Sequence, residues 1–286
     1  MNASLAREDV ADLGDPRLAD YRNLRDAELL LRRDRFIVEG RGNLRVLLTR
    51  TVLRPESLLL SEAACAALEA ELVPLVRGIP VFVAPQSVLD AVVGFRVHRG
   101  ALAVCRRPAP RDPTALALEV LGREPAPRVI VLEGVRDADN VGGIFRAAMA
   151  FGARAVFLCA SACDPLYRKA VRTSMGGSLC VPFARAEEPV ELLSTLRAKG
   201  FCVLAFDPKE PGEALEDLCD RLPGPVALLF GTEGAGLSDA ALAGADRRVR
   251  IGMEDGVDSL NVATAAAIGL HDLRARADAR ACRDGG

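Results

Sequence analysis

A first candidate for chemistry is the stretch "GVRDADNVGGIFRAAMAFGA" (Gly134–Ala153), which combines a glycine pair with polar side chains. We predict Asn140 as the N-cap of a helix, because its side chain can accept the free backbone N–H groups of the first turn. Arg146 then lies within the first turns of that helix. A cation is mildly unfavourable near a helix N-terminus, so we expect Arg146 to meet an anion. Taken alone, the stretch is also compatible with a capped strand–helix turn and a surface arginine.

The second stretch, "LLFGTEGAGLSD" (Leu228–Asp239), is a predicted strand that ends in a glycine-rich loop. Its glycines, Gly231, Gly234 and Gly236, fit neither GxGxxG nor GxxxxGK[ST], and no lysine follows them. Glu233 would also repel a phosphate. These features disfavour nucleotide-phosphate binding. They leave open a backbone that packs on an adenosine or amino-acid group, or an ordinary glycine-rich turn.

The third stretch, "RIGMEDGVDSLNVATAAAIGL", places Asp258, Ser259 and Asn261 at the start of an alanine-rich helix. We predict Ser259 as the N-cap of this helix. The small residues behind it allow close backbone packing. By itself, the pattern indicates no more than a capped helix.

The elements around these stretches alternate between apolar strands and helices. The predicted strands are "RVIVLEG", "AVFLCA", "FCVLAF", "VALLFG" and "RVRIGM", and the predicted helices are Val141–Phe151, Tyr167–Met175, Pro189–Lys199, Asp239–Ala245 and Ser259–Asp278. Strands that are apolar throughout indicate a parallel sheet covered on both faces. Ligands of such sheets bind at the carboxyl ends of the strands. The three loops are therefore expected to form one site.

The N-terminal part reads as a separate, smaller α/β domain. An amphipathic helix is predicted from Pro16 to Asp34, followed by alternating short strands and helices that end with the strand Ala101–Pro108. Pro108, Pro110 and Pro113 mark a linker. We therefore predict a domain over residues 1–107, a linker over 108–127 and a second domain over 128–286.

In this order and spacing, the three stretches resemble the motifs of the SpoU (TrmH) family of RNA ribose 2′-O-methyltransferases, in the SPOUT superfamily. The segment "DPLYRKAVRTSMGGSLCVPF" between them is also similar, so the resemblance covers Arg128 to about Ala275. The N-terminal part resembles, more loosely, the L30e-like substrate-binding domain of many members. Two positions depart from the family pattern. Ala138 and Gly252 stand where prolines are common, and Gly252 frees a φ angle that proline would fix.

The resemblance implies an α/β fold whose parallel-sheet SPOUT domain contains a deep trefoil knot. It further implies that S-adenosylmethionine is bound largely by backbone groups, and that the protein dimerises with itself through the knot domain. The cofactor-binding positions carried over are Leu229, Gly231, Ile251, Met253, Leu260 and Asn261.

The implied reaction transfers a methyl group to a ribose 2′-hydroxyl of RNA. The resemblance places Arg146 and Asn140 at the reacting group, with Glu233, Ser259 and Asn261 completing a polar wall. Because guanidinium deprotonation is very costly, we predict that Arg146 orients the substrate and stabilises the developing alkoxide and the adjacent phosphate. Structured ribosomal RNA is the favoured substrate. Transfer RNA, a non-catalytic RNA-binding or assembly role and, more weakly, a nucleotide-dependent oxidoreductase are the alternatives.

Charge and composition add partners and exclusions. The 286-residue chain has a net charge of −2, yet nine arginines face four acids between Arg22 and Arg54. This local patch could bind RNA phosphates or form a solvated helix face. The RNA-binding candidates are Arg22, Arg25, Arg32, Arg33, Arg41, Arg45, Arg168 and Arg172.

The eight cysteines are scattered without a CxxC pair, which favours small buried hydrophobes over metal or disulfide use. The polar N-terminus does not resemble a signal peptide, and the apolar runs are too short to span a bilayer. We expect a cytoplasmic protein without metal.

Overall fold

The computed structural model describes residues 5–22, 33–94, 97, 100–159, 161–209, 211–218, 222 and 224–284. Contacts divide the chain into two compact units. The first comprises Met1–Ala109 with Leu166–Cys180, and the second Pro110–Pro165 with Val181–Gly286. Residues 166–180, which the predicted boundaries assign to the C-terminal domain, therefore pack with the N-terminal unit.

The first unit is built on a mixed sheet of five strands in the order β1-β4-β3-β5-β2. Strand β5, between β3 and β2, is antiparallel to both of its neighbours. The elements of this unit are β1 (Glu8–Asp9), the 3-10 helix η1 (Pro16–Tyr21), β2 (Arg35–Glu39), α2 (Arg41–Arg50), β3 (Pro55–Ser61), α3 (Glu62–Leu72), β4 (Val81–Ala84), α4 (Gln86–Val93), β5 (Ala101–Arg106), α7 (Arg168–Thr173) and α8 (Gly177–Cys180). This confirms an N-terminal α/β unit.

The helix predicted over Pro16–Asp34 is wrong in its first part. The structure has a six-residue 3-10 helix, which ends where Arg22 turns to an extended backbone (φ −82°, ψ 135°). Leu18 and Tyr21 are fully buried against the sheet. Residues three apart share a face in a 3-10 helix, so this short element buries both side chains. Residues 23–32 lie outside the described residues.

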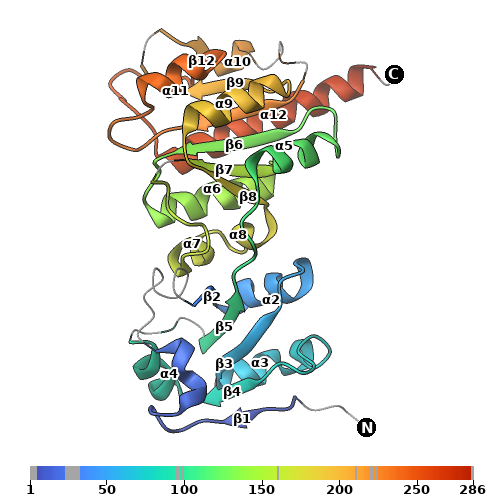
Figure 1. The fold of residues 1–286 in the computed structure, drawn as a ribbon, viewed down its shortest axis with the longest axis vertical. Helices are drawn as coiled ribbons and strands as arrows, with labels where there is room; N and C mark the ends of the chain where they lie inside the picture. Colours follow the sequence, from blue (N-terminus) through green and yellow to red (C-terminus); the bar gives the residue numbers. More distant parts are fainter. Residues whose placement is uncertain are drawn as a thin grey trace. The chain divides into compact units, whose positions relative to one another are not determined.

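The second unit contains a sheet of seven strands, in the order β10-β12-β9-β11-β6-β7-β8, in which every pair is parallel. Its elements, green to red in Figure 1, are α5 (Pro113–Leu121), β6 (Arg128–Glu133), α6 (Ala138–Phe151), β7 (Ala155–Cys159), β8 (Phe183–Ala186), α9 (Pro189–Ala198), β9 (Cys202–Phe206), β10 (Glu213–Ala214), α10 (Leu215–Leu218), β11 (Val226–Phe230), α11 (Asp239–Gly244), β12 (Arg247–Arg250) and α12 (Val262–Asp284). The predicted parallel sheet is confirmed.

Helices cover both faces of this sheet. One face packs against α5, α9 and α11 in a single apolar cluster, which includes Leu229. The opposite face packs against α12, where Gly269 gives room to the rings and methyl groups of Phe206 and Leu228. A Cβ at Gly143 of α6 would lie 2.9 Å from the Cβ of Ala263, so α6 and α12 cross at close range. Small residues at both positions make this crossing possible.

Candidate active site

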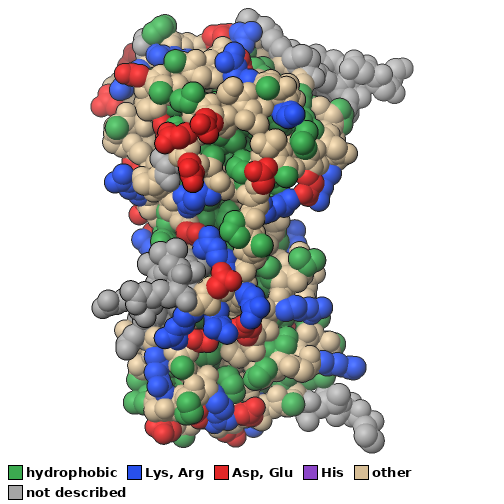
Figure 2. Space-filling model, in the orientation of Figure 1, with side chains coloured by type: hydrophobic (Ala, Val, Ile, Leu, Met, Phe, Trp, Pro, Cys, Tyr) green, Lys and Arg blue, Asp and Glu red, His purple; other side chains and the backbone are tan. Residues whose placement is uncertain are grey.

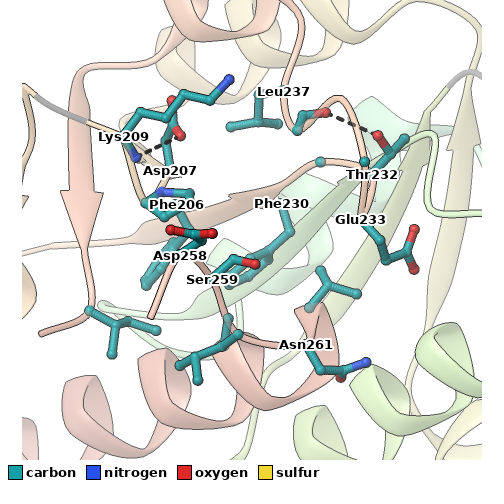
Figure 3. A pocket seen from close by; sticks show the side chains of 18 of the residues that line it. Phe206, Asp207, Lys209, Phe230, Thr232, Glu233, Leu237, Asp258, Ser259 and Asn261 are labelled. Atoms are coloured by element: carbon teal, nitrogen blue, oxygen red, sulfur yellow. Dashed lines mark hydrogen bonds between the residues drawn. The ribbon is translucent and has the colours of Figure 1, made fainter. Parts of the chain in front are cut away.

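A cavity of about 660 Å³ opens at the carboxyl ends of β9, β11 and β12, as expected for a parallel sheet (Figure 3). Its apolar wall includes Phe206 and Phe230, the last residues of β9 and β11, whose rings stack with centroids 4.6 Å apart. The glycine loop 231–237 and residues 258–262 form further parts of the wall. Strand alternation explains this arrangement, because Phe230 faces the cavity while Leu229 faces the core on the other side.

The three predicted stretches meet in one chain of side-chain hydrogen bonds. The Nδ2 amide of Asn261 donates to Oδ1 of Asn140 over 2.8 Å. The Nδ2 amide of Asn140 in turn donates to Oε1 of Glu233. Residues from α6, from the loop after β11 and from the start of α12 are thereby joined, although 121 positions separate Asn140 from Asn261.

Both ends of this chain fix its polarity. Oδ1 of Asn261 accepts from the backbone N–H groups of Ala263 (2.9 Å) and Thr264 (3.3 Å), so its Nδ2 must face Asn140. Asn140 must then present its oxygen to Asn261 and its amide to the Glu233 carboxylate, which accepts hydrogen bonds when ionised. The direction Asn261 to Asn140 to Glu233 is therefore set by a helix end and a carboxylate.

The same contacts correct two predicted helix caps. Asp137, not Asn140, caps α6, because its side chain accepts from the N–H groups of Asp139 and Asn140. Asn261, not Ser259, caps α12 through the two contacts to Ala263 and Thr264. Asn140 is thus released from capping, and its side chain is free to link Asn261 and Glu233.

The glycine loop is closed on itself and has no room for a side chain at its first position. Thr232 and Gly236 exchange two backbone hydrogen bonds of 3.1 Å each. A Cβ at Gly231 would lie 2.3 Å from the backbone carbon of Gly236, whereas nothing lies within 4 Å of one at Gly234. Gly231 is therefore required by a close backbone approach, and Gly234 is not.

Most predicted cofactor positions line the cavity. Gly231, Ile251, Met253, Leu260 and Asn261 do so, together with the predicted polar residues Glu233 and Ser259 (Figure 3). Leu229 does not, because its side chain is fully buried in the apolar cluster on the opposite face.

Arg146 lies outside the cavity. It is exposed on α6, six residues past Asn140, and within the described residues it makes no hydrogen bond or ion pair. An unpaired guanidinium on the helix that carries Asn140 is available to a substrate anion.

A model of the SpoU rRNA Methylase family matches residues 127–271 of the chain. The chain belongs to the SpoU rRNA methylase family. An uncharacterized tRNA/rRNA methyltransferase of Mycobacterium tuberculosis strain CDC 1551 is 41% identical over 276 residues, which cover 93% of this chain and 91% of the relative. The predicted family is thus confirmed, and with it an RNA methyltransferase; membership of this family implies the trefoil knot.

Solved structures support the same fold over almost the whole chain. The SpoU methyltransferase AviRb of Streptomyces viridochromogenes, in complex with AdoMet, has a TM-score of 0.75 and 25% identity, covering 93% of this chain and 100% of that chain. An AdoMet-bound rRNA methyltransferase of Sinorhizobium meliloti has a TM-score of 0.78 and 24% identity, covering 94% and 98%. Both units of the chain therefore have counterparts in SpoU enzymes.

The predicted RNA-binding arginines differ in how they are engaged. Arg33 pairs with Asp20 (2.8 Å), Arg45 with Glu71 (2.6 Å) and Arg168 with the buried Glu39 (3.3 Å). The Arg45 guanidinium lowers the pKa of Glu71. Figure 2 shows acidic side chains interspersed with basic ones on the visible face of the N-terminal unit. Acidic partners thus offset part of the positive charge in this stretch.

The remaining arginines of this set have other positions. Arg22 donates to the backbone oxygen of Asp15 (2.5 Å), and Arg41 lies on α2. Arg172 is exposed on α7 and makes no ion pair with any described residue. Arg25 and Arg32 lie outside the described residues.

Several residues that line the cavity were not among the predicted site residues. Phe206, Asp207 and Lys209 come from the end of β9 and the loop after it, and Phe230 ends β11. Their positions in the sequence could have identified them, because they lie at or directly after the carboxyl ends of predicted strands, where ligands of parallel sheets bind.

No grouping of three or more His, Cys, Asp or Glu side chains in the described part of the chain suits a metal ion. Within the same ranges, none of the helices combines the length and apolar character that a membrane crossing requires.

Proposed function

We propose that this protein transfers a methyl group from S-adenosylmethionine to a ribose 2′-hydroxyl of ribosomal RNA. The observation that carries the proposal is the hydrogen-bond chain Asn261–Asn140–Glu233 at the edge of a large cavity. It joins all three family motifs in one place. A protein that kept the fold only to bind RNA would not need this polarised set of groups beside a ligand cavity.

The cavity suits S-adenosylmethionine in size and chemistry. Its volume of about 660 Å³ lies within the usual range for small-molecule sites. The stacked Phe206 and Phe230 offer an apolar wall for the adenine, and the glycine loop offers backbone groups at close range. Among its described lining residues, three carboxylates (Asp207, Glu233 and Asp258) outnumber one cation, Lys209. This balance favours a ligand with a positive sulfonium over a nucleotide phosphate.

S-adenosylmethionine supplies an electrophilic methyl group when it is bound. The chain's own residues then hold and orient the RNA. Asn140, fixed between Asn261 and Glu233, orients the ribose, and Arg146 binds the neighbouring phosphate and stabilises negative charge on the 2′-oxygen. Because Arg146 stays protonated, the hydroxyl proton leaves by another route.

We infer the substrate class from the exposed arginines and the assembly from the family. The N-terminal unit supplies exposed arginines for the backbone of a structured RNA, with Arg172 as the main candidate. Ribosomal RNA is favoured over transfer RNA because the family model that the chain matches is that of the SpoU rRNA methylases. The active form is a homodimer through the knot domain.

Calorimetry of the purified protein with S-adenosylmethionine and, separately, with NAD tests the cofactor. Saturable binding of S-adenosylmethionine without binding of NAD supports the proposal. Binding of NAD alone would revive the oxidoreductase alternative. Absence of S-adenosylmethionine binding by the dimer would leave the non-catalytic alternative.

A further inference from the structure

Glu133 is a buried carboxylate that the proposed chemistry does not use. It is the last residue of β6, and it is 9% exposed. A carboxylate at such a position is costly unless hydrogen bonds replace its water. The structure provides two such bonds, and both come from a single residue of another motif.

That residue is Ser238, directly after the glycine loop. Its backbone N–H donates to Oε2 of Glu133 over 2.9 Å, and its hydroxyl donates to Oε1 over 2.7 Å. The same hydroxyl accepts from the N–H of Ala241 over 3.1 Å, so that Ser238 also caps α11. Both the backbone N–H and the hydroxyl group of Ser238 therefore take part in hydrogen bonds.

A second contact braces the loop on the same strand end. Gly134, at φ +66°, follows Glu133, and a Cβ there would lie 3.0 Å from Cγ2 of Thr232. Thr232 exchanges backbone hydrogen bonds with Gly236, and Gly236 lies two residues before Ser238. The loop is thus closed on itself, held by Ser238 at its end and packed on Gly134 at its beginning.

Glu133 also lies at the start of the segment that leads to Asn140. The loops of the first two motifs are therefore tied at two levels, by Glu133 and Ser238 at the base and by Asn140 and Glu233 at the cavity. Among the described residues, those that line the cavity include neither Glu133 nor Ser238. Their effect on the site must pass through the loop between them.

We infer that Glu133 is a positioning residue, which through Ser238 holds the loop 231–237 in the form that binds S-adenosylmethionine. The inference rests on the proposed cofactor. Glu133, at the end of β6, would then contribute to the affinity for the cofactor as well as to the packing of the sheet.

Three variants test it. Glu133→Gln keeps the shape but replaces one carboxylate oxygen with an amide donor, so the two Ser238 hydrogen bonds lose their charged acceptor. Ser238→Ala removes the hydroxyl, whereas Ser238→Thr retains it. The control is Asp112→Ala, which removes the cap contact to Ala115 (2.7 Å) at the start of α5 in the same unit, away from the loop.

Calorimetry should show affinity for S-adenosylmethionine reduced about tenfold in Glu133→Gln and Ser238→Ala, as expected for loss of a charge-assisted contact. Ser238→Thr and Asp112→Ala should bind as the wild type does. The double variant Glu133→Gln/Ser238→Ala should bind no more weakly than the more affected of the two single variants, because both changes act on the same contact between Glu133 and Ser238. Additive losses, or unchanged affinity in both single variants, would overturn the inference.

Amide hydrogen exchange of the ligand-free protein gives a readout that does not depend on the cofactor. Exchange across residues 231–238 should be faster in Glu133→Gln than in the wild type, and unchanged in Asp112→Ala. Equal exchange in Glu133→Gln and wild type would overturn the inference. If exchange rises but the wild type does not bind S-adenosylmethionine, the positioning role stands and the proposed function fails.

Discussion

At the scale of single residues, the central feature is an amide whose orientation is fixed from both sides. Asn140 receives a hydrogen bond from Asn261 and donates one to Glu233. Since Asn261 must cap α12 with its oxygen, reversing the order would set the amide oxygen of Asn140 against a carboxylate. The arrangement of Asn261, Asn140 and Glu233 therefore depends on which group donates in each hydrogen bond, as well as on the presence of the bonds.

The variant Asn261→Asp tests this polarity. An aspartate keeps the oxygen that caps α12 but cannot donate to Asn140, so we expect thermal stability close to that of the wild type and methyl transfer reduced by about 100-fold. Thermal unfolding and turnover on total RNA would be measured together. Asn261→Ala, which also loses the cap, should be destabilised by about 1 kcal/mol as well. Full activity in Asn261→Asp would refute a role for the direction of the bonds.

Arg146 carries the second prediction at this scale. It lies outside the cavity and has no partner among the described residues, so Arg146→Ala should leave S-adenosylmethionine affinity within about twofold while methyl transfer falls about 100-fold or more. Arg123→Ala, an exposed arginine of the same unit, is the control. Isothermal titration and a methyl-transfer assay separate the two effects. Parallel loss of binding and transfer would show that Arg146 supports the fold instead.

At the scale of elements, close backbone approach determines which glycines matter. Gly231→Ala would set a Cβ 2.3 Å from the backbone of Gly236, so we expect the loop to open and cofactor binding to be lost. Gly234→Ala, in the same loop, has open space and a negative φ, and it should bind as the wild type does. Calorimetry of the pair decides. Equal binding by both variants would contradict a loop that depends on its closed form.

The elements also show what the sequence could predict and what it could not. The strands of the parallel sheet are visible as continuous apolar runs, because both faces are buried. Strand β8 was missed, since "FARA" alternates too weakly to be distinguished. Both caps were misassigned, because Asp137 and Asn140, like Ser259 and Asn261, are all good capping types and side-chain geometry decides between them.

At the scale of the whole molecule, the motif resemblance carried information that periodicity could not. The strand order β12-β9-β11-β6 brings the three motifs together, but no local pattern encodes it. Seven of the residues that the resemblance implied, Gly231, Glu233, Ile251, Met253, Ser259, Leu260 and Asn261, line the cavity, and the side chain of Leu229 is buried on the other side of β11. The resemblance implied S-adenosylmethionine as the methyl donor, and the solved structures from Sinorhizobium meliloti and Streptomyces viridochromogenes both contain it.

The RNA surface gives a prediction at this scale. Arg172 is exposed without an ion pair among the described residues, whereas Arg45 is paired with Glu71. Arg172→Ala should weaken RNA binding and reduce the slope of log affinity against log salt by about 1, with a smaller change for Arg45→Ala. Filter binding over a series of salt concentrations measures both. Identical slopes in wild type and Arg172→Ala would exclude Arg172 from the phosphate contacts.

The most direct test of the account is the product of the reaction. The protein would be incubated with methyl-labelled S-adenosylmethionine and separated ribosomal and transfer RNA from cells that lack its gene, and the digested nucleosides would then be analysed. We predict label in a 2′-O-methylated nucleoside of ribosomal RNA, absent with Arg146→Ala. Label on a base, or no transfer to either RNA by a protein that binds the cofactor, would contradict ribose methylation, and label confined to transfer RNA would contradict the proposed substrate.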